Sequence, residues 1–147
     1  MINIEGETIM NLYLNVNKDL KDNIICERHT ILDDTSSGIR SHYIFAFDNG
    51  YGASVVKCTD TIPSYGVEED LWELALLKEV ANDYPESSIT YEDCISRFVI
   101  AYEPIVNFDV IGYMTDAEVN EVLERIKKGD IYKSYSEEKE KNNDQDK

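Results

Sequence analysis

The chain contains three cysteines and two histidines, and their spacing bears on whether they could bind a metal or form a catalytic pair. Cys26 and His29 have the spacing of half a zinc site. A complete site needs a second close pair, whereas His42, Cys58 and Cys94 are isolated in the sequence. We therefore predict no metal site, and reduced thiols in a cytoplasmic protein. An enzyme that pairs one of these thiols with a histidine remains an alternative.

Neighbouring carboxylates recur at residues 33–34, 68–70 and 92–93. Such groups can perform acid–base chemistry when their surroundings separate their pKa values. In a chain with 30 acidic residues, however, neighbouring carboxylates are expected from composition, so we interpret them as solvated charge. None of them lies in the D-x-[DN]-x-[DN]-G pattern of a calcium loop. The sequence thus predicts no enzymatic activity and no cofactor.

The segment FAFDNGYGASVV, residues 45–56, contains a G-x-G sequence that could either bind a phosphate or form a turn. A dinucleotide fingerprint needs a third glycine followed by a helix, but here a valine and strand-like residues follow. Asn49-Gly50 is instead the strongest short-range signal of a β-hairpin. We predict a two-residue turn there, with Phe47 opposite Gly52.

Length and charge limit the class of protein. A chain of 147 residues with 42% hydrophobic residues suits one domain with a buried core. Its net charge is −16, and residues 41–128 alone carry 17 acidic and six basic side chains. Such a field repels nucleic acid and anionic membranes, and it favours basic protein surfaces. No segment resembles a signal peptide or a membrane span.

The sequence divides into three regions. Residues 1–40 carry weak signals, apart from an alternation of apolar side chains at 12–16, and are expected to form a partly ordered N-terminal extension. Residues 41–129 are expected to form a compact α+β domain. Residues 130–147 end in a run of charged and polar residues, which predicts a disordered tail.

The clearest single element is a helix within MTDAEVNEVLERIKKGD. Thr115 and Glu118 match a capping box, in which each side chain binds a free backbone amide at the start of the helix. The apolar residues recur at helical spacing and form one stripe: Val119, Val122, Leu123 and Ile126. Gly129 is a typical helix stop.

Other segments are less distinct. Residues 67–84, VEEDLWELALLKEVANDY, fit a helix by propensity and a strand by alternation, so local signals leave open whether 68–81 is strand or helix. Residues 89–92 and 98–102 are strand-like, and Pro104 ends the second run.

The chain resembles a group of small phage and prophage proteins of uncharacterised function. The resemblance lies in the order of four segments: FDNGYGASVV, SYG…LWELALL, ITYE and DVIGYMTDAEVNEVLERIKK. The resemblance covers residues 43–128, and none of its motifs is catalytic. It implies an α+β domain, a small antiparallel sheet with one C-terminal amphipathic helix packed on it, and it favours a strand at LWELALL, residues 71–77. This chain departs from the pattern in its N-terminal extension and in a longer link between Ile89 and Asp109.

Tyrosine is abundant, with ten residues in the chain. Tyrosine is enriched at protein interfaces, but it also suits half-buried positions of a small sheet, and the sequence does not separate the two. We predict that an acidic, tyrosine-bearing surface binds a partner through these residues: Tyr51, Tyr65, Glu68, Glu69, Asp70, Tyr91, Glu92 and Asp93.

The leading hypothesis is a non-enzymatic phage protein that acts in the cytoplasm of a bacterial host cell. It would bind the basic surface of a host protein and inhibit a defence or transcription complex, without contacting nucleic acid or a membrane. An alternative is an oligomeric protein that captures a small ligand such as a nucleotide signal, for which Lys57, Lys78 and Arg97 are the available central cations. A third is self-assembly into a homo-oligomer through a sheet edge.

Overall fold

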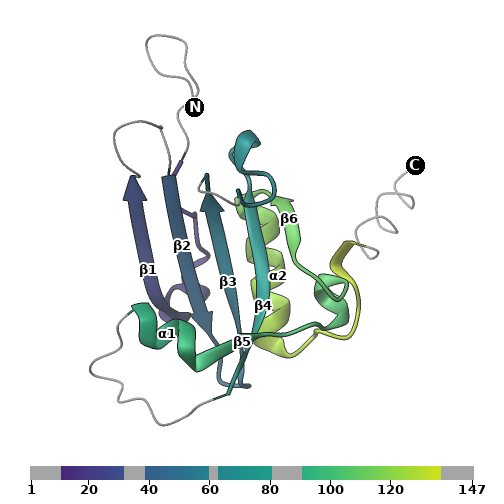
Figure 1. Ribbon diagram of the computed structural model, residues 1–147. Helices are drawn as coiled ribbons and strands as arrows, with labels where there is room; N and C mark the ends of the chain where they lie inside the picture. Colours follow the sequence, from purple (N-terminus) through teal and green to yellow (C-terminus); the bar gives the residue numbers. More distant parts are fainter. Residues whose placement is uncertain (1–10, 32–38, 60–62, 81–90, 137–147) are drawn as a thin grey trace, which may run out of the picture.

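The computed structural model describes residues 11–31, 39–59, 63–80 and 91–136. They form a six-stranded antiparallel sheet with helices on both sides, which confirms the predicted α+β class (Figure 1). The strand order is β1-β2-β3-β4-β5, and β6 pairs with β4 beside β5. The strands are β1 (Ile24–Ile31), β2 (Ile39–Ala46), β3 (Tyr51–Cys58), β4 (Trp72–Glu79), β5 (Phe98–Ile100) and β6 (Ile111–Met114).

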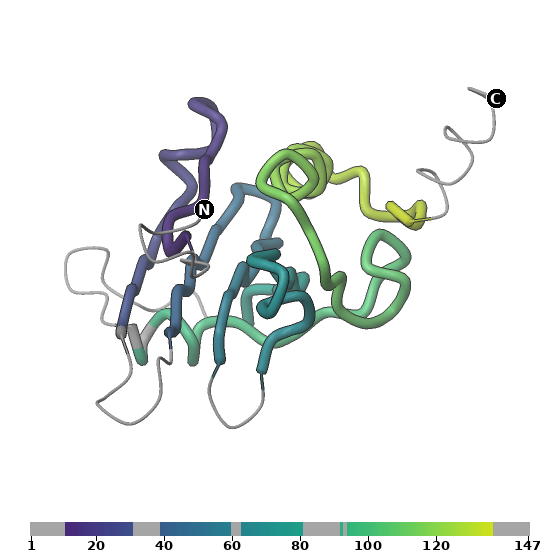
Figure 2. The backbone as a smooth tube through the Cα atoms, turned by 90° about the horizontal axis from the view of Figure 1, so that it is seen from above, coloured from purple at the N-terminus to yellow at the C-terminus, as the bar shows by residue number. Residues whose placement is uncertain are grey.

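Different elements cover the two faces of the sheet. Helix α2 (Asp116–Lys128) and the N-terminal segment 11–23, which ends in the 3-10 helix η1 (Lys18–Asn23), lie on one face (Figure 2). The short helix α1 (Tyr91–Arg97) lies on the other. We call these the core face and the α1 face. The core face carries Tyr43, Phe45, Val55, Leu74 and Leu76, and the α1 face carries Ile44, Ser54, Ala75 and Leu77.

The β2–β3 hairpin lies where the sequence predicted it, but its register differs by one residue. Ala46, and not Phe47, is opposite Gly52. Beyond the strand ends, the Phe47 amide donates a hydrogen bond to the Tyr51 carbonyl at 2.9 Å, which leaves a loop of three residues, 48–50. The Gly50 amide donates a hydrogen bond to the Phe47 carbonyl at 3.3 Å. Gly50 has φ +85°, whereas Asn49 is not among the residues with positive φ. The two-residue turn was therefore wrong: it needs two consecutive left-handed residues, and the chain forms a three-residue loop with one.

The first described residues, 11–31, belong to the same sheet and core as the rest of the described chain. Strand β1 pairs with β2 along most of its length, and Leu14, Val16 and Leu20 are buried against the core face. Within the described residues, the boundary predicted at residue 41 therefore does not separate two bodies. The segment of apolar alternation at 12–16 is extended but is not a strand of the sheet.

The C-terminal end of the described chain also packs on the fold. Ile131 and Tyr135 are buried in the main core, and the Ile105 amide donates a hydrogen bond to the Ile131 carbonyl at 3.0 Å. The region predicted as a disordered tail thus begins with ordered residues, and its remainder, 137–147, lies outside the described part of the chain.

The ambiguous segments take different forms. Residues 72–79 form strand β4, as the resemblance implied, and residues 98–100 form β5 as predicted. The strand expected at 89–92 was wrong at Tyr91 and Glu92, which begin α1, while 89–90 lie outside the described residues. Cys94 in α1 and Phe98 at the start of β5 are buried against the apolar α1 face, and the packing of Cys94 offers a reason for a helix here.

Helix α2 has the predicted ends and buried stripe. The Thr115 hydroxyl accepts a hydrogen bond from the Glu118 amide at 3.2 Å, and Glu118 Oε1 accepts one from the Thr115 amide at 3.1 Å. Gly129 ends the helix with φ +80°. The four apolar residues of the stripe are fully buried, so the helix closes the core face.

Candidate functional site

Part of the predicted interaction set gathers at one end of the sheet. Tyr65, Glu68 and Glu69 are exposed beside the 3-10 turn η2 (Val67–Glu69), which leads into β4. Tyr65 is 58% exposed, so its ring is available to contact a partner. These three residues therefore form the best candidate for the predicted interface.

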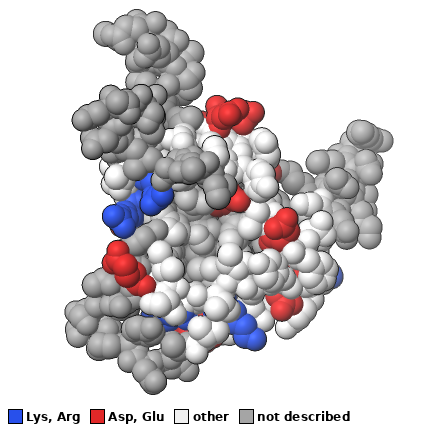
Figure 3. All heavy atoms as spheres, viewed as in Figure 1, with Lys and Arg blue, Asp and Glu red and all other residues white. Residues whose placement is uncertain are grey.

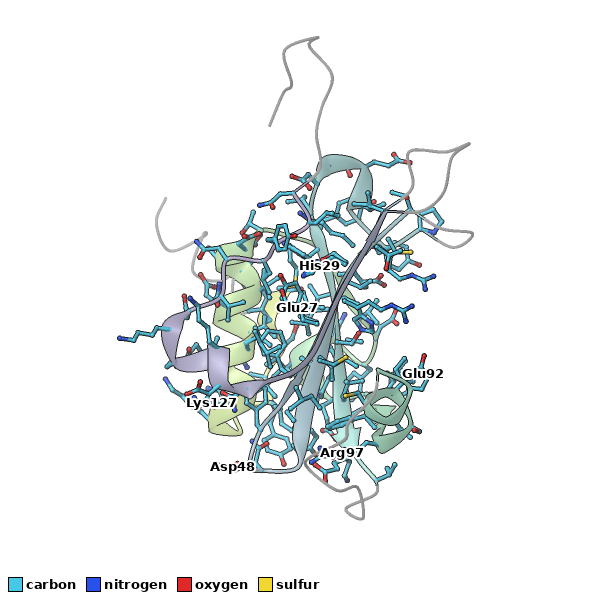
Figure 4. All side chains as sticks on the ribbon, turned by 90° about the vertical axis from the view of Figure 1, so that its left-hand side faces the viewer. Glu27, His29, Asp48, Glu92, Arg97 and Lys127 are labelled. Carbon is cyan, nitrogen blue, oxygen red and sulfur yellow. The ribbon has the colours of Figure 1, made fainter. Side chains whose placement is uncertain are left out.

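The other predicted residues lie elsewhere. Tyr51 is half-buried on the core face, and Lys78 Nζ lies 6.0 Å from the centre of its ring. Tyr91, Glu92 and Asp93 belong to α1 on the opposite face, where Glu92 is exposed (Figure 4). The structure does not bring these residues together with the η2 end, so a single surface made of the whole predicted set is not formed.

Tyr113 in β6 lies against Tyr65, although sequence reasoning did not select it. The Tyr113 amide donates a hydrogen bond to the Tyr65 carbonyl at 3.2 Å. The close approach requires two glycines: a Cβ on Gly112 would lie 2.4 Å from Tyr65 Cβ, and one on Gly66 would lie 2.8 Å from Tyr113 Cα. Tyr113 is 59% exposed. We call Tyr65, Glu68, Glu69 and Tyr113 the Tyr65–Tyr113 patch.

Backbone strain marks the same region. Tyr113 has φ +56°, and Phe108, in the loop before β6, has φ +60° and is 62% exposed. Bulky residues rarely adopt positive φ, and such conformations cost about 1–3 kcal/mol each. Strain of this kind concentrates at binding and catalytic sites. No sequence signal could have identified it, because neither residue is a type that favours this conformation.

Carboxylates border the patch. Burial raises the pKa of Glu73 in β4, and the nearby charge of Asp109 raises it further, whereas a hydrogen bond with the Tyr65 backbone lowers it. Glu73 therefore lies close to Tyr65 and to Asp109. Acidic side chains also appear at the upper end of the sheet in Figure 3, above β4. This end of the molecule would attract a cationic ligand.

A buried lysine holds η2 in place. Lys57 in β3 is 1% exposed, and its Nζ lies 2.8 Å from Asp70 Oδ1 and donates to the Asn11 carbonyl at 2.9 Å. The same Nζ is 4.3 Å from the centre of the Trp72 ring. Asp70 also accepts a hydrogen bond from the Asn11 amide at 3.0 Å. The carboxylate of Asp70, predicted to contact a partner, is thus used inside the protein.

A cavity of about 210 Å³ lies on the α1 face. It is half open, and the space-filling view of this face shows a hollow of uncharged surface at its centre (Figure 3). Strands β2, β3, β4 and β5 and helix α1 contribute residues to its walls. The lining residues are His42, Ile44, Ser54, Ala75, Leu77, Cys94, Ile95, Phe98 and Ile100.

One hydrogen-bonded pair of polar side chains lines the pocket, together with the Cys94 thiol. His42 Nε2 and Ser54 Oγ are 2.6 Å apart, within hydrogen-bonding distance. Burial, together with the smaller effect of the nearby Arg40 cation, lowers the pKa of His42 to about 4. His42 is therefore neutral at physiological pH. The sequence did not indicate this pair, because it depends on the register between β2 and β3.

The pair has the composition of a nucleophile and its base, but the surroundings do not favour catalysis. Ser54 lies in the middle of β3, paired with Ile44 on one side and Ala75 on the other. Backbone amides there serve the sheet ladder, so they are not aimed at a substrate as an oxyanion hole requires. A histidine with so low a pKa is also a weak base near neutral pH. The arrangement suits binding.

The predicted Cys26-x-x-His29 half-site does not form. Residues three apart on a strand point to opposite faces, and Cys26 lies with Cys94 on the α1 face while His29 lies on the core face (Figure 4). His29 bonds to Ser41 and Glu27, each at 2.7 Å. In the described part of the chain, no three metal-ligating side chains are grouped.

The cations proposed for a nucleotide ligand do not converge. Lys57 is buried against Asp70, and Lys78 lies over a ring on the core face. Arg97 pairs with Glu79 at 3.3 Å on the other side of the sheet. A phosphate group would therefore not meet all three cations at one point.

Comparison with protein-family models, with curated proteins and with solved structures finds no match to this chain. None of the helices in the described residues combines the length and apolar character that crossing a bilayer requires.

Proposed function

We propose that this protein binds a basic surface of another protein through the Tyr65–Tyr113 patch. The observation that carries the proposal is the pair of exposed tyrosines, held together by a backbone hydrogen bond, two glycines and a strained residue. Preorganised aromatic side chains lose little entropy on binding, and tyrosine is enriched among residues that dominate binding energy.

Charge supports a basic partner. Glu68 and Glu69 are exposed at the edge of the patch, Glu73 and Asp109 lie beside it, and the whole chain carries −16. Opposite charges on the partner would accelerate encounter and make the rate fall with added salt.

The resemblance to phage and prophage proteins is the reason for proposing a partner in a bacterial host cell. In this proposal the protein acts in the cytoplasm as an inhibitor, and it occupies a basic channel or groove that a host defence or transcription complex uses for nucleic acid. No catalytic step is needed, because occupation alone blocks the site.

The test is an affinity capture from bacterial lysate at low salt with the full chain, read by mass spectrometry and repeated with purified candidates. We expect a stoichiometric basic partner that is released at high salt. Tyr65→Ala and Tyr113→Ala should each weaken binding about 30-fold, because truncating a central tyrosine typically costs about 2 kcal/mol. Tyr132→Ala is the matched control, since Tyr132 is 71% exposed and interacts with Tyr51 at the opposite end of β3.

The proposal fails if no basic protein is captured at low salt. It also fails if a captured partner binds the Tyr65→Ala and Tyr113→Ala variants as tightly as the control. In that case the exposed tyrosines would be surface residues without a binding role.

Capture of a small ligand is the second candidate, and the α1-face pocket is the observation that favours it. A nucleotide is a poor fit. The cavity of about 210 Å³ is below the roughly 300–1,000 Å³ of sites that enclose drug-sized ligands. The ligand class that the pocket does fit is argued next.

A further inference from the structure

We infer that the α1-face pocket binds a small, uncharged, largely apolar molecule that carries one hydrogen-bond donor, such as a substituted phenol. The pocket is on a different surface from the Tyr65–Tyr113 patch, and the inference does not depend on protein binding.

The volume of the cavity limits the size of the ligand. The cavity of about 210 Å³ exceeds the roughly 150 Å³ of an engineered apolar cavity that holds benzene. One six-membered ring with one or two small substituents would therefore fit. A larger ligand would extend through the open side into solvent.

The residues that line the pocket favour a ligand that is largely apolar. Among the lining residues, Cys94 and Phe98 are buried, whereas Ile95 and Ile100 are 48% and 49% exposed. Exposed aliphatic side chains that line a pocket lose contact with water when a ligand enters. A ring in the pocket would gain this burial without any rearrangement of the sheet.

The two polar side chains that line the pocket, His42 and Ser54, determine which polar group the ligand should carry. His42 and Ser54 hydrogen-bond to each other, and whichever of them donates, Ser54 Oγ keeps a lone pair that can accept a further hydrogen bond. If His42 donates, the Ser54 O–H also remains to donate, so the ligand group that completes this pair's hydrogen bonds in either tautomer is a hydroxyl, which can both donate and accept. A charged head group would lose hydration among apolar walls, and a carboxylate would also meet the protein's negative field.

The experiment is a titration of the full-length, ¹⁵N-labelled protein with p-cresol, followed by amide chemical shifts and by calorimetry. We expect saturable binding, with shifts on β2, β3, β4 and α1. Toluene has the same ring without the hydroxyl, and should bind roughly fivefold more weakly, the value of one hydrogen bond. The charged analogue 4-methylbenzoate should bind more weakly than p-cresol as well.

Two variants test the location. Ala75→Phe fills the pocket from β4, and Ile100→Trp fills it from β5, so each should reduce p-cresol affinity at least tenfold. Having both variants protects the test if one of them folds poorly. Ala117→Phe adds the same bulk as the first at an exposed position on α2 and should leave binding unchanged.

The inference is overturned if p-cresol binding does not saturate, or if both pocket variants bind it as tightly as Ala117→Phe. Equal affinity for toluene, or tighter binding of 4-methylbenzoate, would overturn the assignment of an uncharged donor head group.

Discussion

Replacing Asp70 with asparagine tests the buried network that holds η2. The substitution removes one charge and keeps the size of the side chain. Asparagine also tolerates the left-handed conformation of this position, where φ is +60°, so the backbone is not strained further. The change isolates the effect of leaving the Lys57 ammonium group without its carboxylate.

The expected loss follows from the burial of the pair. The Lys57 side chain is 2% exposed and the Asp70 side chain is 23% exposed. Removing one partner of a buried ion pair costs about 3–5 kcal/mol. Because Asp70 is partly hydrated, we take the lower end, about 3 kcal/mol. For a chain of this size, that loss lowers Tm by about 6–12 °C.

Urea unfolding followed by fluorescence is the suitable assay. Trp72 is the single tryptophan of the chain, and its ring lies 4.3 Å from Lys57 Nζ. Glu68→Gln is the control, because it removes an exposed carboxylate from the same turn and should change stability by less than about 0.5 kcal/mol. The double variant Lys57→Met with Asp70→Asn should regain stability relative to Asp70→Asn, since no unpaired charge remains.

A loss below about 1 kcal/mol for Asp70→Asn, indistinguishable from Glu68→Gln, would refute this reasoning. Such a result would mean that the ammonium group keeps its stabilisation from the Asn11 carbonyl and the Trp72 ring alone. Failure of the double variant to regain stability would show that the cost arises from lost packing, and not from an unpaired charge.

Three further predictions concern the hairpin, the helix and the pocket. Gly52→Ala should lower the free energy of unfolding in urea by more than about 4 kcal/mol, because its Cβ would lie 2.2 Å from the Phe45 carbonyl oxygen. Gly50→Ala should lower it by about 1–2 kcal/mol, because Gly50 has φ +85° but no atom lies within 4 Å of the added Cβ. Thr115→Ala removes the helix cap and should cost about 1 kcal/mol in the same assay. Burial lowers the pKa of His42 from 6.5 to about 4, so the unfolded state binds the proton first. Stability from this group is therefore present above pH 6.5 and falls by about 3 kcal/mol toward pH 4. The variant His42→Gln should lose that component of the pH dependence in unfolding measured between pH 7 and pH 4.

Some elements could be predicted because their signals are local. The Thr115–Glu118 capping box, the apolar stripe and Gly129 all concern residues within one helix, and each agrees with the others. The hairpin at Asn49-Gly50 was placed for the same reason. Its register was not, because two-residue and three-residue loops are both compatible with this sequence and differ by a one-residue shift.

Other elements depend on distant partners. Segment 11–23 shows little local preference, and it is ordered because α2 and the sheet offer it a surface: Asn120 in α2 accepts a hydrogen bond from the Asn17 amide and donates one to the Asn15 carbonyl, both at 2.8 Å. In α1, the strand-like alternation at Tyr91 and Glu92 competes with helical packing of Cys94 against the sheet, and the packing prevails.

The sequence by itself determined the capped helix, the position of the hairpin and the acidic character of the protein, because these follow from composition and from neighbours within a few residues. The α+β class was implied by the resemblance to phage and prophage proteins. Only the tertiary structure decided which tyrosines are presented together, where the carboxylate of Asp70 is used, and that His42 and Ser54 share a pocket. Each of these depends on strand register and on close backbone approach between segments far apart in the chain. Side-chain types along one segment do not encode such geometry, since a shift of one residue places every side chain of a strand on the opposite face.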